Sequence, residues 1–308
     1  MVIGVVGASL AGLAVARSLG KQGHQVLVFE KSSTWSGRFT TLKAGNDQTP
    51  VDVHIPYIDV KNESFKALVD ELVAKNLMKA VESNVSSYVN GEISGASMEY
   101  EGSELYATTK GMAAVAQYMA RYCDVKFDAE VVGITYIGDN TKKKAPWMIN
   151  LVSNEVFELD AVVIAVPAPQ ALAILENAQD ETSIRRAIAN INEMRYDARY
   201  SVVATYPNKS LTDWSILEIG GNDVELVVNE SIKNGSKDLI LTLHSSNEFF
   251  QKAVHLKENE IIDLLLKNAA SIVGDFVYNP EKTVIVKRKY VKPERYLEPT
   301  FINIEGLN

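Results

Sequence analysis

The chain opens with Val2-Ile3-Gly4-Val5-Val6-Gly7-Ala8-Ser9-Leu10-Ala11-Gly12, an apolar run that passes into a turn with glycines at positions 7 and 12. A second apolar run, Val26-Leu27-Val28-Phe29, ends at Glu30. This order predicts a buried strand, a helix and a second parallel strand, with the helix N-terminus at the turn. Gly7 permits the tight turn, and Gly12 lets the helix lie close to the strand. The stretch therefore favours an α/β fold of the Rossmann type.

The same turn has the features of a dinucleotide-binding site. A helix N-terminus offers free backbone N–H groups and a positive dipole end to a pyrophosphate. Glu30 follows the glycines by about twenty residues, where a carboxylate can bind a free ribose 2′-hydroxyl. Ser9 occupies the middle glycine position of the G-x-G-x-x-G pattern, where its side chain crowds a phosphate although its hydroxyl can donate to one. A strand–helix–strand unit that binds no nucleotide is the alternative.

Composition excludes several classes of protein. The 308 residues, 46% of them hydrophobic, can bury one large or two moderate cores, and the formal net charge of -8 argues against nucleic acid or an anionic membrane surface as a partner. Cys123 is the only cysteine and the four histidines lack ligand spacing, so we expect neither an internal disulfide nor a metal site. No apolar stretch reaches the roughly 18 residues of a membrane span. Because the first strand starts at Val2, we expect no signal peptide and a cytoplasmic location.

Hydrophobic periodicity divides the rest of the chain into elements. Helices are expected at 63–79, 110–122, 169–192 and 258–273, and an apolar strand at 161–166 returns the chain to the first sheet. Strands expected at 125–127, 130–137, 147–152 and 156–159 form an antiparallel meander, with Lys142-Lys143-Lys144 in a polar turn. A second antiparallel sheet is expected from strands at 200–206, 214–219, 224–230 and 238–244. Further strands are expected at 51–55, 284–291 and 301–304, and short ones with turns between them near 84–107.

Taken together, the order of these elements resembles the flavin amine oxidase superfamily, and within it the renalase family. The matching positions run nearly from end to end and include the Gly7–Gly12 loop, Glu30-Lys31, Ser36-Gly37-Arg38, Lys110-Gly111-Met112, Ala165-Val166-Pro167-Ala168-Pro169, Arg199-Tyr200 and the helix 258–273. The resemblance implies a Rossmann-like domain that binds FAD non-covalently, made of residues 1–60, 105–170 and 292–308. An inserted substrate domain, with an antiparallel sheet and helices, would comprise residues 61–104 and 171–291.

The resemblance also implies site residues and a reaction. The glycine turn and acidic residue would hold the adenosine diphosphate half of FAD, with the arginine along the pyrophosphate and a valine on the adenine. The candidate cofactor residues are Gly7, Ser9, Leu10, Ala11, Gly12, Glu30, Lys31, Gly37, Arg38, Val131, Ala165 and Pro167. The flavin would take a hydride from a small substrate, such as an isomeric dihydronicotinamide dinucleotide or an amine, and pass the electrons to molecular oxygen. Tyr200 and His244 match positions that face the substrate, which makes them the candidate catalytic residues.

Several positions depart from the family pattern. Ser9 and Ser36 each replace a glycine, Asp52-Val53-His54-Ile55-Pro56 replaces a small-residue turn beside the flavin ring, and Arg288 replaces an aromatic residue. Residues 301–306 resemble the strand that enters the family's final glycine-aspartate motif, and the sequence ends at Asn308. Three interpretations stay open: an FAD enzyme whose last segment lies outside this sequence, a flavin-free binding or scaffold protein on the same fold, and an NAD-dependent reductase. The meander at 125–159 argues against the last.

Overall fold

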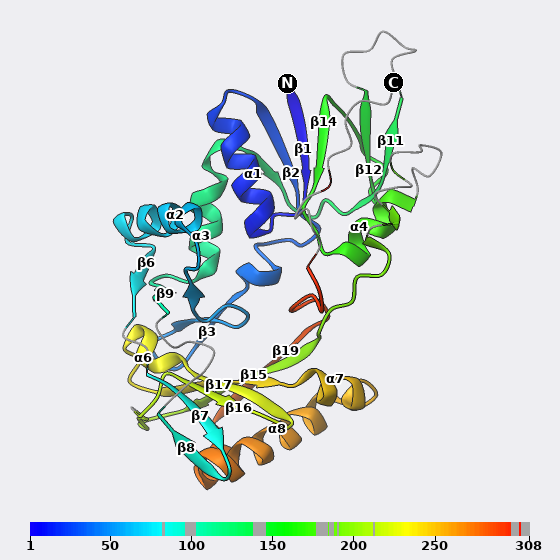
Figure 1. Ribbon diagram of the computed structural model, residues 1–308. Helices are drawn as coiled ribbons and strands as arrows, with labels where there is room; N and C mark the ends of the chain where they lie inside the picture. The colour runs from blue at the N-terminus through cyan, green and yellow to red at the C-terminus, as the bar shows by residue number, and fades with distance from the viewer. Residues whose placement is uncertain are drawn as a thin grey trace. The chain divides into compact units, whose positions relative to one another are not determined.

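The computed structural model describes residues 1–81, 84–95, 103–137, 146–176, 184, 188–189, 191–211, 213–296 and 302 (Figure 1). The chain forms two compact units, one of Met1–Phe39, Ala116–Tyr196 and Lys292–Asn308 and the other of Thr40–Val115 and Asp197–Val291. The expected lysine turn at 142–144 lies outside the described residues, as does the expected strand at 301–304 apart from Ile302. Assignment of an FAD domain and a substrate domain, with the limits given above, stays a prediction.

A four-stranded parallel sheet organises the first unit. Its strand order is β10-β2-β1-β14, with β1 at Val2–Val6, β2 at Gln25–Phe29, β10 at Asp124–Lys126 and β14 at Ala161–Ile164. Helix α1 (Leu10–Lys21) joins β1 to β2, and β14 pairs with the other side of β1. The chain adds β2 on one side of β1 and β14 on the other, so the strand order changes direction between β1 and β14. Open α/β sheets bind ligands at such a switch point. The predicted α/β class with a Rossmann-like unit is confirmed.

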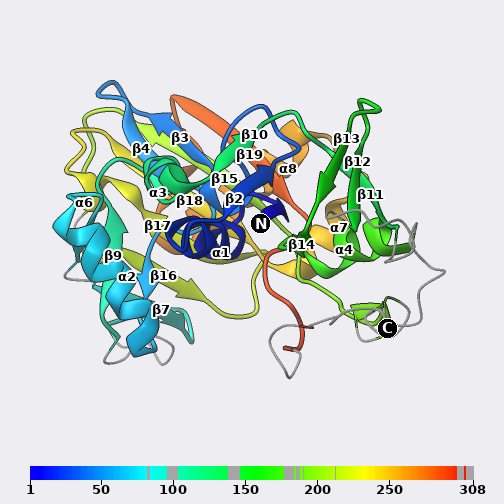
Figure 2. The same ribbon diagram turned by 90° about the horizontal axis from the view of Figure 1, so that it is seen from above.

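An antiparallel meander accompanies this sheet, as predicted, but it has fewer strands. It consists of β11 (Val131–Tyr136), β12 (Trp147–Leu151) and β13 (Val156–Leu159). Figures 1 and 2 show the meander and α1 on opposite sides of the parallel sheet. The prediction that residues 125–127 belong to the meander is wrong, because β10 pairs in parallel with β2. Asp128 then turns the chain away with a φ of 54°.

Apolar side chains fill the space between the parallel sheet and the meander. Phe29, Ile149 and Leu159 are almost fully buried there. The rings of Phe29 and Phe157 meet edge to face, with centroids 5.0 Å apart. Helix α4 (Ala168–Leu175), which follows β14, adds Ile174 to the same core.

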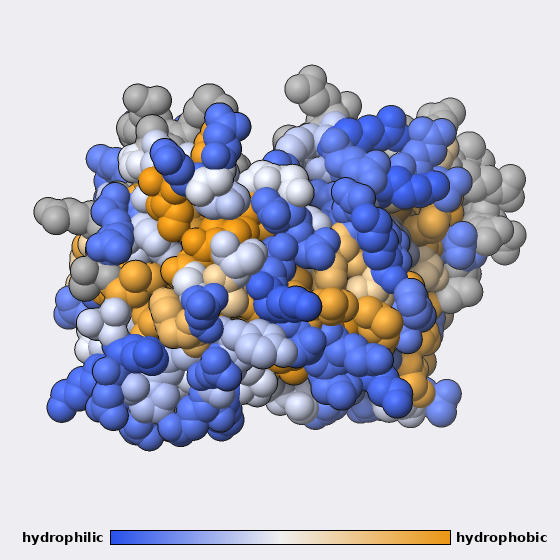
Figure 3. Space-filling view, turned by 90° about the horizontal axis from the view of Figure 1, so that it is seen from below, coloured by the Kyte–Doolittle hydropathy of each residue, from blue (hydrophilic) through white to orange (hydrophobic). Residues whose placement is uncertain are grey.

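A seven-stranded sheet organises the second unit. Its order is β19-β15-β18-β17-β16-β7-β8, with β19 at Lys282–Arg288, β15 at Arg199–Tyr206, β18 at Leu239–Ser245, β17 at Val224–Asn229, β16 at Ile216–Ile219, β7 at Val85–Val89 and β8 at Glu92–Ser94. All neighbours are antiparallel except β16 and β7. One face packs on α7 (Asn247–Ala253) and α8 (Glu258–Val273), and α8 has the bounds that its periodicity predicts. The exposed residues of α8 are mostly hydrophilic. Figure 3 shows the molecule from below, with hydrophilic residues interspersed with apolar patches.

Smaller elements complete the second unit. They are β3 (Thr41–Ala44), β4 (Thr49–Asp52), β5 (Ile58–Asp59), α2 (Glu63–Ala74), β6 (Met78–Ala80), β9 (Leu105–Thr108) and α6 (Glu230–Asn234), while α3 (Met112–Met119) begins in this unit and ends in the first. The predicted helix 63–79 is too long, because Asn76 adopts a φ of 54° and the chain continues as β6. Within the described part of the chain, no helix has both the length and the apolar character that crossing a membrane requires.

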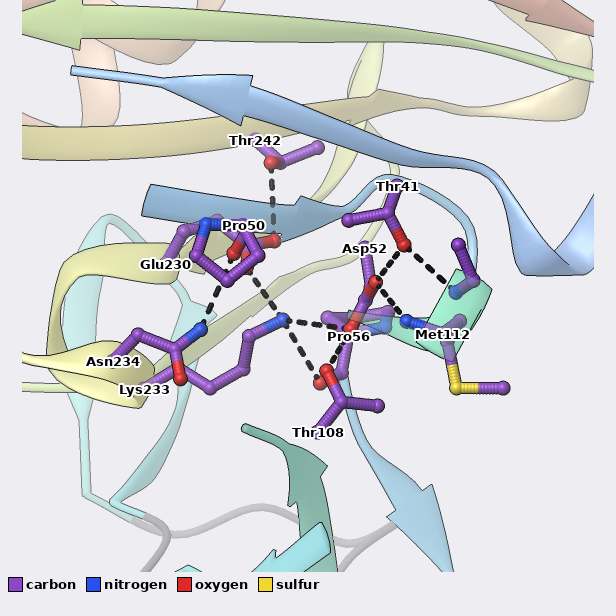
Figure 4. A network of polar contacts seen from close by, with 11 residues as sticks. Thr41, Pro50, Asp52, Pro56, Thr108, Met112, Glu230, Lys233, Asn234 and Thr242 are labelled. Carbon is purple, nitrogen blue, oxygen red and sulfur yellow. Dashed lines mark hydrogen bonds and ion pairs between the residues drawn. The ribbon is translucent and has the colours of Figure 1, made fainter. Parts of the chain in front are cut away.

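A buried ionic network joins these smaller elements to the sheet (Figure 4). The Lys233 ammonium lies 2.7 Å from Glu230 Oε2 and 3.7 Å from Asp52 Oδ2, and the side chains of Lys233 and Glu230 have no exposed surface. Burial lowers the pKa of Lys233, but the two carboxylates outweigh burial and raise it overall. Lys233 is therefore held in its charged form between two acids.

Asp52 is the centre of that network. Its Oδ1 accepts hydrogen bonds from Thr41 Oγ1 at 2.8 Å and from Met112 N at 2.7 Å, and its Oδ2 accepts one from Thr108 Oγ1. The donors come from β3, β9 and the first residue of α3. Glu230 Oε1 in turn accepts a hydrogen bond from Thr242 Oγ1 of β18, at 3.2 Å. One chain of polar contacts thus fixes six elements: β3, β4, β9, α3, α6 and β18.

Replacing Lys233 with methionine tests this network. K233M leaves two buried carboxylates without their cation, so we expect a loss of about 3–5 kcal/mol in the free energy of unfolding. The matched control is K252M, since Lys252 has a comparable 2.7 Å ion pair with Glu248 but its side chain is 67% exposed. The control should cost far less, because an ion pair between exposed side chains contributes little to stability. Urea unfolding of the three proteins makes the comparison, and equal losses for the two variants would contradict the prediction.

Candidate cofactor and substrate sites

The glycine turn after β1 brings α1 unusually close to the strand ends. Gly7 has a φ of +96°, and a Cβ placed on it would lie 2.7 Å from Val166 Cγ1. A Cβ on Gly12 would lie 2.1 Å from the carbonyl oxygen of Gly7. No side chain fits at either position without displacing backbone or packed atoms. The local sequence therefore sets the helix N-terminus directly against the turn.

Ser9 caps α1 instead of leaving its hydroxyl for a ligand. Its Oγ accepts a hydrogen bond from Gly12 N at 3.1 Å and donates one to Ala165 O at 2.8 Å. The first helical hydrogen bond runs from Leu13 N to Ser9 O, so the N–H groups of Leu10 and Ala11 precede it. These two groups can receive an anion. The hydrogen of the Ser9 hydroxyl points to Ala165 O, so donation to a phosphate would require this hydrogen bond to break.

Glu30 lies beside the same turn, at the carboxyl end of β2. Its Oε2 accepts a hydrogen bond from Ala8 N at 3.1 Å, and its Oε1 accepts from Ser32 N at 3.1 Å and from Ser36 Oγ at 2.9 Å. The residue is 8% exposed. A carboxylate offers about four acceptor positions, so three donors leave about one position for a ribose hydroxyl. The carboxylate is thus fixed in place with spare capacity to bind.

The remaining candidate cofactor residues have different surroundings. Lys31, Gly37 and Arg38 are exposed in the segment after β2, and Gly37 and Arg38 lie in a short 3-10 helix. Val131 is buried at the start of β11, in the core beneath the meander. Ala165 donates its N–H to Val6 O and accepts the Ser9 hydroxyl, while Pro167 precedes α4. The structure therefore brings Gly7, Ser9, Gly12 and Ala165 into direct contact.

These residues fit the adenosine diphosphate half of FAD. Two N–H groups at a helix N-terminus suit a pyrophosphate, and the anchored Glu30 carboxylate suits a ribose. The tight turn leaves room for no Cβ at Gly7 or Gly12. Within the described residues there is no group of three or more His, Cys, Asp or Glu side chains that could hold a metal ion.

The two candidate catalytic residues lie on opposite faces of the seven-stranded sheet. Tyr200 is 3% exposed, belongs to the core on the α7–α8 side, and stacks on Phe250 with ring centroids 4.8 Å apart. His244 pairs across the strands with Ser201, the next residue along β15, whose side chain points to the other face. The expectation that both side chains face one substrate is therefore not supported, and only His244 lies outside that core.

His244 has charged neighbours on its face of the sheet. Burial, then Arg199 and then His54 lower the pKa of His244 well below its usual value. Burial followed by Arg288 and Arg199 lowers the pKa of His54 to about 3. Both imidazoles are consequently neutral at pH 7 in the folded protein.

Sequence reasoning missed the partners that hold these groups. It did not anticipate that Ala8 N and Ser36 Oγ bind Glu30, or that Lys233 pairs with both Glu230 and Asp52. The spacing of Glu230 and Lys233, three apart in a helix, was the available signal for that ion pair. The contact with Asp52 joins positions far apart in the chain and leaves no local pattern.

The turn geometry predicts that Gly12→Ala destabilises the protein. Its Cβ would have to push backbone atoms of the turn apart, for which we expect a cost of about 1–3 kcal/mol in the free energy of unfolding. Gly220→Ala is the control, because a Cβ there meets nothing within 4 Å. Chemical unfolding measures both, and a G12A variant as stable as G220A would show that the close approach is not needed.

The neutral histidines predict a specific loss of stability in acid. In the unfolded chain a histidine has a pKa of about 6.5. Below that pH His54 is therefore protonated in the unfolded state but stays neutral in the folded state. Stability contributed by His54 is full above about pH 6.5 and is lost as pH falls toward its folded pKa of about 3. His54→Asn should reduce the fall in melting temperature between pH 7 and pH 4. His255→Asn, at an exposed position, should not, and identical pH profiles for wild type and H54N would contradict the prediction.

Comparison with known proteins covers both the nucleotide-binding segment and the rest of the chain. Residues 5–72 match the NAD(P)-binding Rossmann-like domain, and residues 93–296 match the family described as flavin containing amine oxidoreductase. A putative flavin-containing monoamine oxidase of Mycobacterium tuberculosis is 43% identical over 68 residues, or 22% of this chain and 14% of that protein. A 4,4'-diapophytoene desaturase of Staphylococcus haemolyticus is 40% identical over 82 residues, or 25% of this chain and 16% of that protein. The matches thus span a small part of these relatives.

Solved structures share the fold over most of the chain. A putative protoporphyrinogen oxidase from Exiguobacterium sp. 255-15 has a TM-score of 0.71 at 9% identity, over 95% of this chain and 87% of that chain. A putrescine oxidase variant has a TM-score of 0.70 at 15% identity, over 92% and 83%. The family match agrees with the predicted class, an FAD-dependent oxidoreductase. With two thirds of its residues in that match, the chain belongs to the family of flavin-containing amine oxidoreductases.

Proposed function

We propose that this chain is an FAD-dependent oxidoreductase of the renalase type, which takes a hydride from a small substrate and passes the electrons to molecular oxygen. The observation that carries the proposal is the Glu30 carboxylate, anchored by Ala8 N at 3.1 Å beside a helix N-terminus that keeps two N–H groups for an anion. That the cofactor is a flavin is inferred from membership of the flavin-containing family. The proposed reaction is inferred from the resemblance of the sequence to the renalase family.

The residues of the first unit bind and orient the cofactor in this proposal. The N–H groups of Leu10 and Ala11 would receive the pyrophosphate, Glu30 would accept a hydrogen bond from a ribose hydroxyl, and Arg38 would lie along the phosphates. Val131 would contact the adenine. Gly37, Lys31, Ala165 and Pro167 would border the same site.

The chemistry that bound FAD would supply is acceptance of a hydride from the substrate and transfer of the two electrons to oxygen. The protein's part is to hold the donor carbon in position and to exclude competing reactions. His244 is the residue of the second unit that we place at the substrate, because its Nε2 is buried and has no partner among the described residues. Since the imidazole is neutral, it can donate or accept a hydrogen bond without adding charge.

Two substrate classes are consistent with the proposal: isomers of dihydronicotinamide dinucleotides and amines. Purified protein loaded with FAD should release hydrogen peroxide with one of them. Peroxide with the dinucleotide isomers supports the renalase type, and peroxide with amines alone assigns the chain to amine oxidation. A protein that takes up FAD but produces peroxide with neither class contradicts the proposed reaction.

Glu30→Ala tests the cofactor site. Loss of a charge-assisted hydrogen bond to the ribose, worth about 1.5–3 kcal/mol, should weaken FAD binding roughly 10- to 100-fold. Titration of the unloaded protein with FAD, followed by flavin absorbance, measures Kd. The control is Glu130→Ala, at an exposed position of the same unit.

Glu30 also holds the turn and the segment after β2, so circular dichroism must show that E30A is folded. Glu30→Gln, which keeps the size of the side chain, serves if E30A is not. Unchanged FAD affinity in a folded Glu30 variant would overturn the assignment of the ribose contact. A wild-type protein that takes up no FAD would favour the flavin-free scaffold, and tight NAD binding in its place would favour the NAD-dependent reductase.

A further inference from the structure

Two arginines stand side by side on the face of the seven-stranded sheet that carries His244. Arg199 on β15 lies directly opposite Arg288 on β19 in the strand register, and these strands are neighbours in Figure 1. Ser201 lies two residues along β15 from Arg199, on the same face, and pairs across the other edge of the strand with His244. The opposite face is filled by the α7–α8 core. The register thus gathers two guanidinium groups and one imidazole on one side of the sheet.

His54 adds a second imidazole to this group. It lies in the segment after β4, and its charge would interact with Arg288, Arg199 and His244. Val51 of β4 and Val53 just after it belong to one core cluster with Val203 of β15, which places this part of the chain over that face. All four residues belong to the second unit.

Positive charge dominates at the imidazoles. Like charges directly opposite each other in a sheet are unfavourable, yet Arg199 and Arg288 occupy such positions. Arg199 Nη2 has an ion pair with Glu225 Oε1 at 3.0 Å, and Arg288 Nε donates to Tyr290 O at 2.9 Å. Glu218, on β16, shares the face but is separated from His244 by Leu226 of β17. Besides burial, Arg199 lowers the pKa of both histidines and Arg288 lowers that of His54. With two guanidinium groups on this face, the potential at the rings favours an anion.

Unpartnered imidazole atoms point to a ligand in the same place. His244 is 1% exposed, and its Nε2 has no hydrogen-bond partner among the described residues; the same holds for the buried Nδ1 of His54. Ser201 Oγ lies 2.9 Å from His244 Nδ1. When the serine hydroxyl donates to Nδ1, the hydrogen of the neutral ring is on Nε2. A buried donor without an acceptor is costly, and an oxygen ligand would satisfy it.

We propose that Arg199, Arg288, His54 and His244 bind an oxyanion group, a carboxylate or a phosphate, of the substrate. Guanidinium groups bind both anions through paired N–H donors, and the His244 ring adds a neutral donor. This inference rests on the proposed function for its claim that the ligand is a substrate. The four residues hold a non-reacting part of the molecule and are positioning residues. The substrate class is accordingly narrowed to compounds that carry such an anion.

The test measures anion binding directly on the full chain, with and without FAD. Protein with isotope-labelled histidines is titrated with inorganic phosphate and, separately, with acetate, and the imidazole signals are followed by NMR. We expect saturable shifts of the His54 and His244 signals with at least one anion. Those of His24 and His255 should not move. Binding of phosphate alone, or of acetate alone, supports the site and identifies which anion the substrate carries.

Variants identify the arginines. Arg199→Gln and Arg288→Gln should each weaken anion binding at least about tenfold, as expected for loss of a hydrogen bond between charged groups. Lys282→Gln is the matched control, because Lys282 is an exposed cation on the same strand as Arg288. It should change the affinity less than twofold. If a glutamine variant fails to fold, Arg199→Lys and Arg288→Lys keep the charge and should still weaken binding, because lysine lacks the paired donors.

Absence of saturable shifts with both anions, or unchanged affinity in folded arginine variants, would overturn the proposed site. FAD uptake, read separately by flavin absorbance, distinguishes the two proposals. Anion binding by a protein that takes up no FAD would support the anion site and contradict the proposed oxidoreductase function. FAD uptake without anion binding would support the FAD-dependent function and contradict the anion site.

Discussion

The absence of a side chain at Gly12 is the constraint on which the nucleotide-binding unit depends. A Cβ there would lie 2.1 Å from the Gly7 carbonyl oxygen, so only glycine lets α1 begin against the turn. That approach allows Ser9 to bridge Gly12 N and Ala165 O, which joins the end of β14 to the helix. Glu30 accepts from Ala8 N and joins the end of β2 to the same turn. Three strand ends and one helix thus meet through a handful of backbone groups.

The second unit differs from the first in that charged side chains are buried in its interior. Its large sheet has an apolar face against α7 and α8 and a second face that carries His244, Arg199 and Thr242. The Lys233 ammonium compensates the charges of the buried Asp52 and Glu230 carboxylates. Asp52 also accepts hydrogen bonds from Thr41, Thr108 and Met112. Satisfied polar groups of this kind fix one arrangement of the surrounding strands. The second face also carries apolar residues, Val203 and Ile240 among them, and its rigidly held polar groups suit recognition of a charged ligand.

Local patterns in the sequence were sufficient to predict most helices and strands, but not to predict which elements and side chains each of them contacts. The glycine turn predicted β1, α1 and β2, and periodicity gave the bounds of α8, since both signals lie within a few consecutive turns or strands. The end of α2 depended on the backbone of Asn76, and the partner of β10 depended on a strand about a hundred residues away. Tyr200 and Ser201 must face opposite sides of any strand, but which side meets His244 is decided by the pairing of β15 with β18. The Glu30 contacts and the Lys233 network are of the same non-local kind.

The pairing of β1 with β14 has a consequence for how the protein is made. Val2 N donates to Asp160 Oδ2 across a separation of 158 residues, and β1 has no second neighbour until β14 has been synthesised. Contacts so distant in the chain slow folding, because a long loop must close before they form. During translation the strand therefore leaves the ribosome long before its partner, and the backbone N–H and C=O groups of one edge stay unpaired and open to incorrect pairing. Because β2 and α1 follow β1 directly in the sequence, β2 can pair with β1 and α1 can pack on it as soon as they are synthesised. These early contacts cover one edge and one face of β1 in the nascent chain.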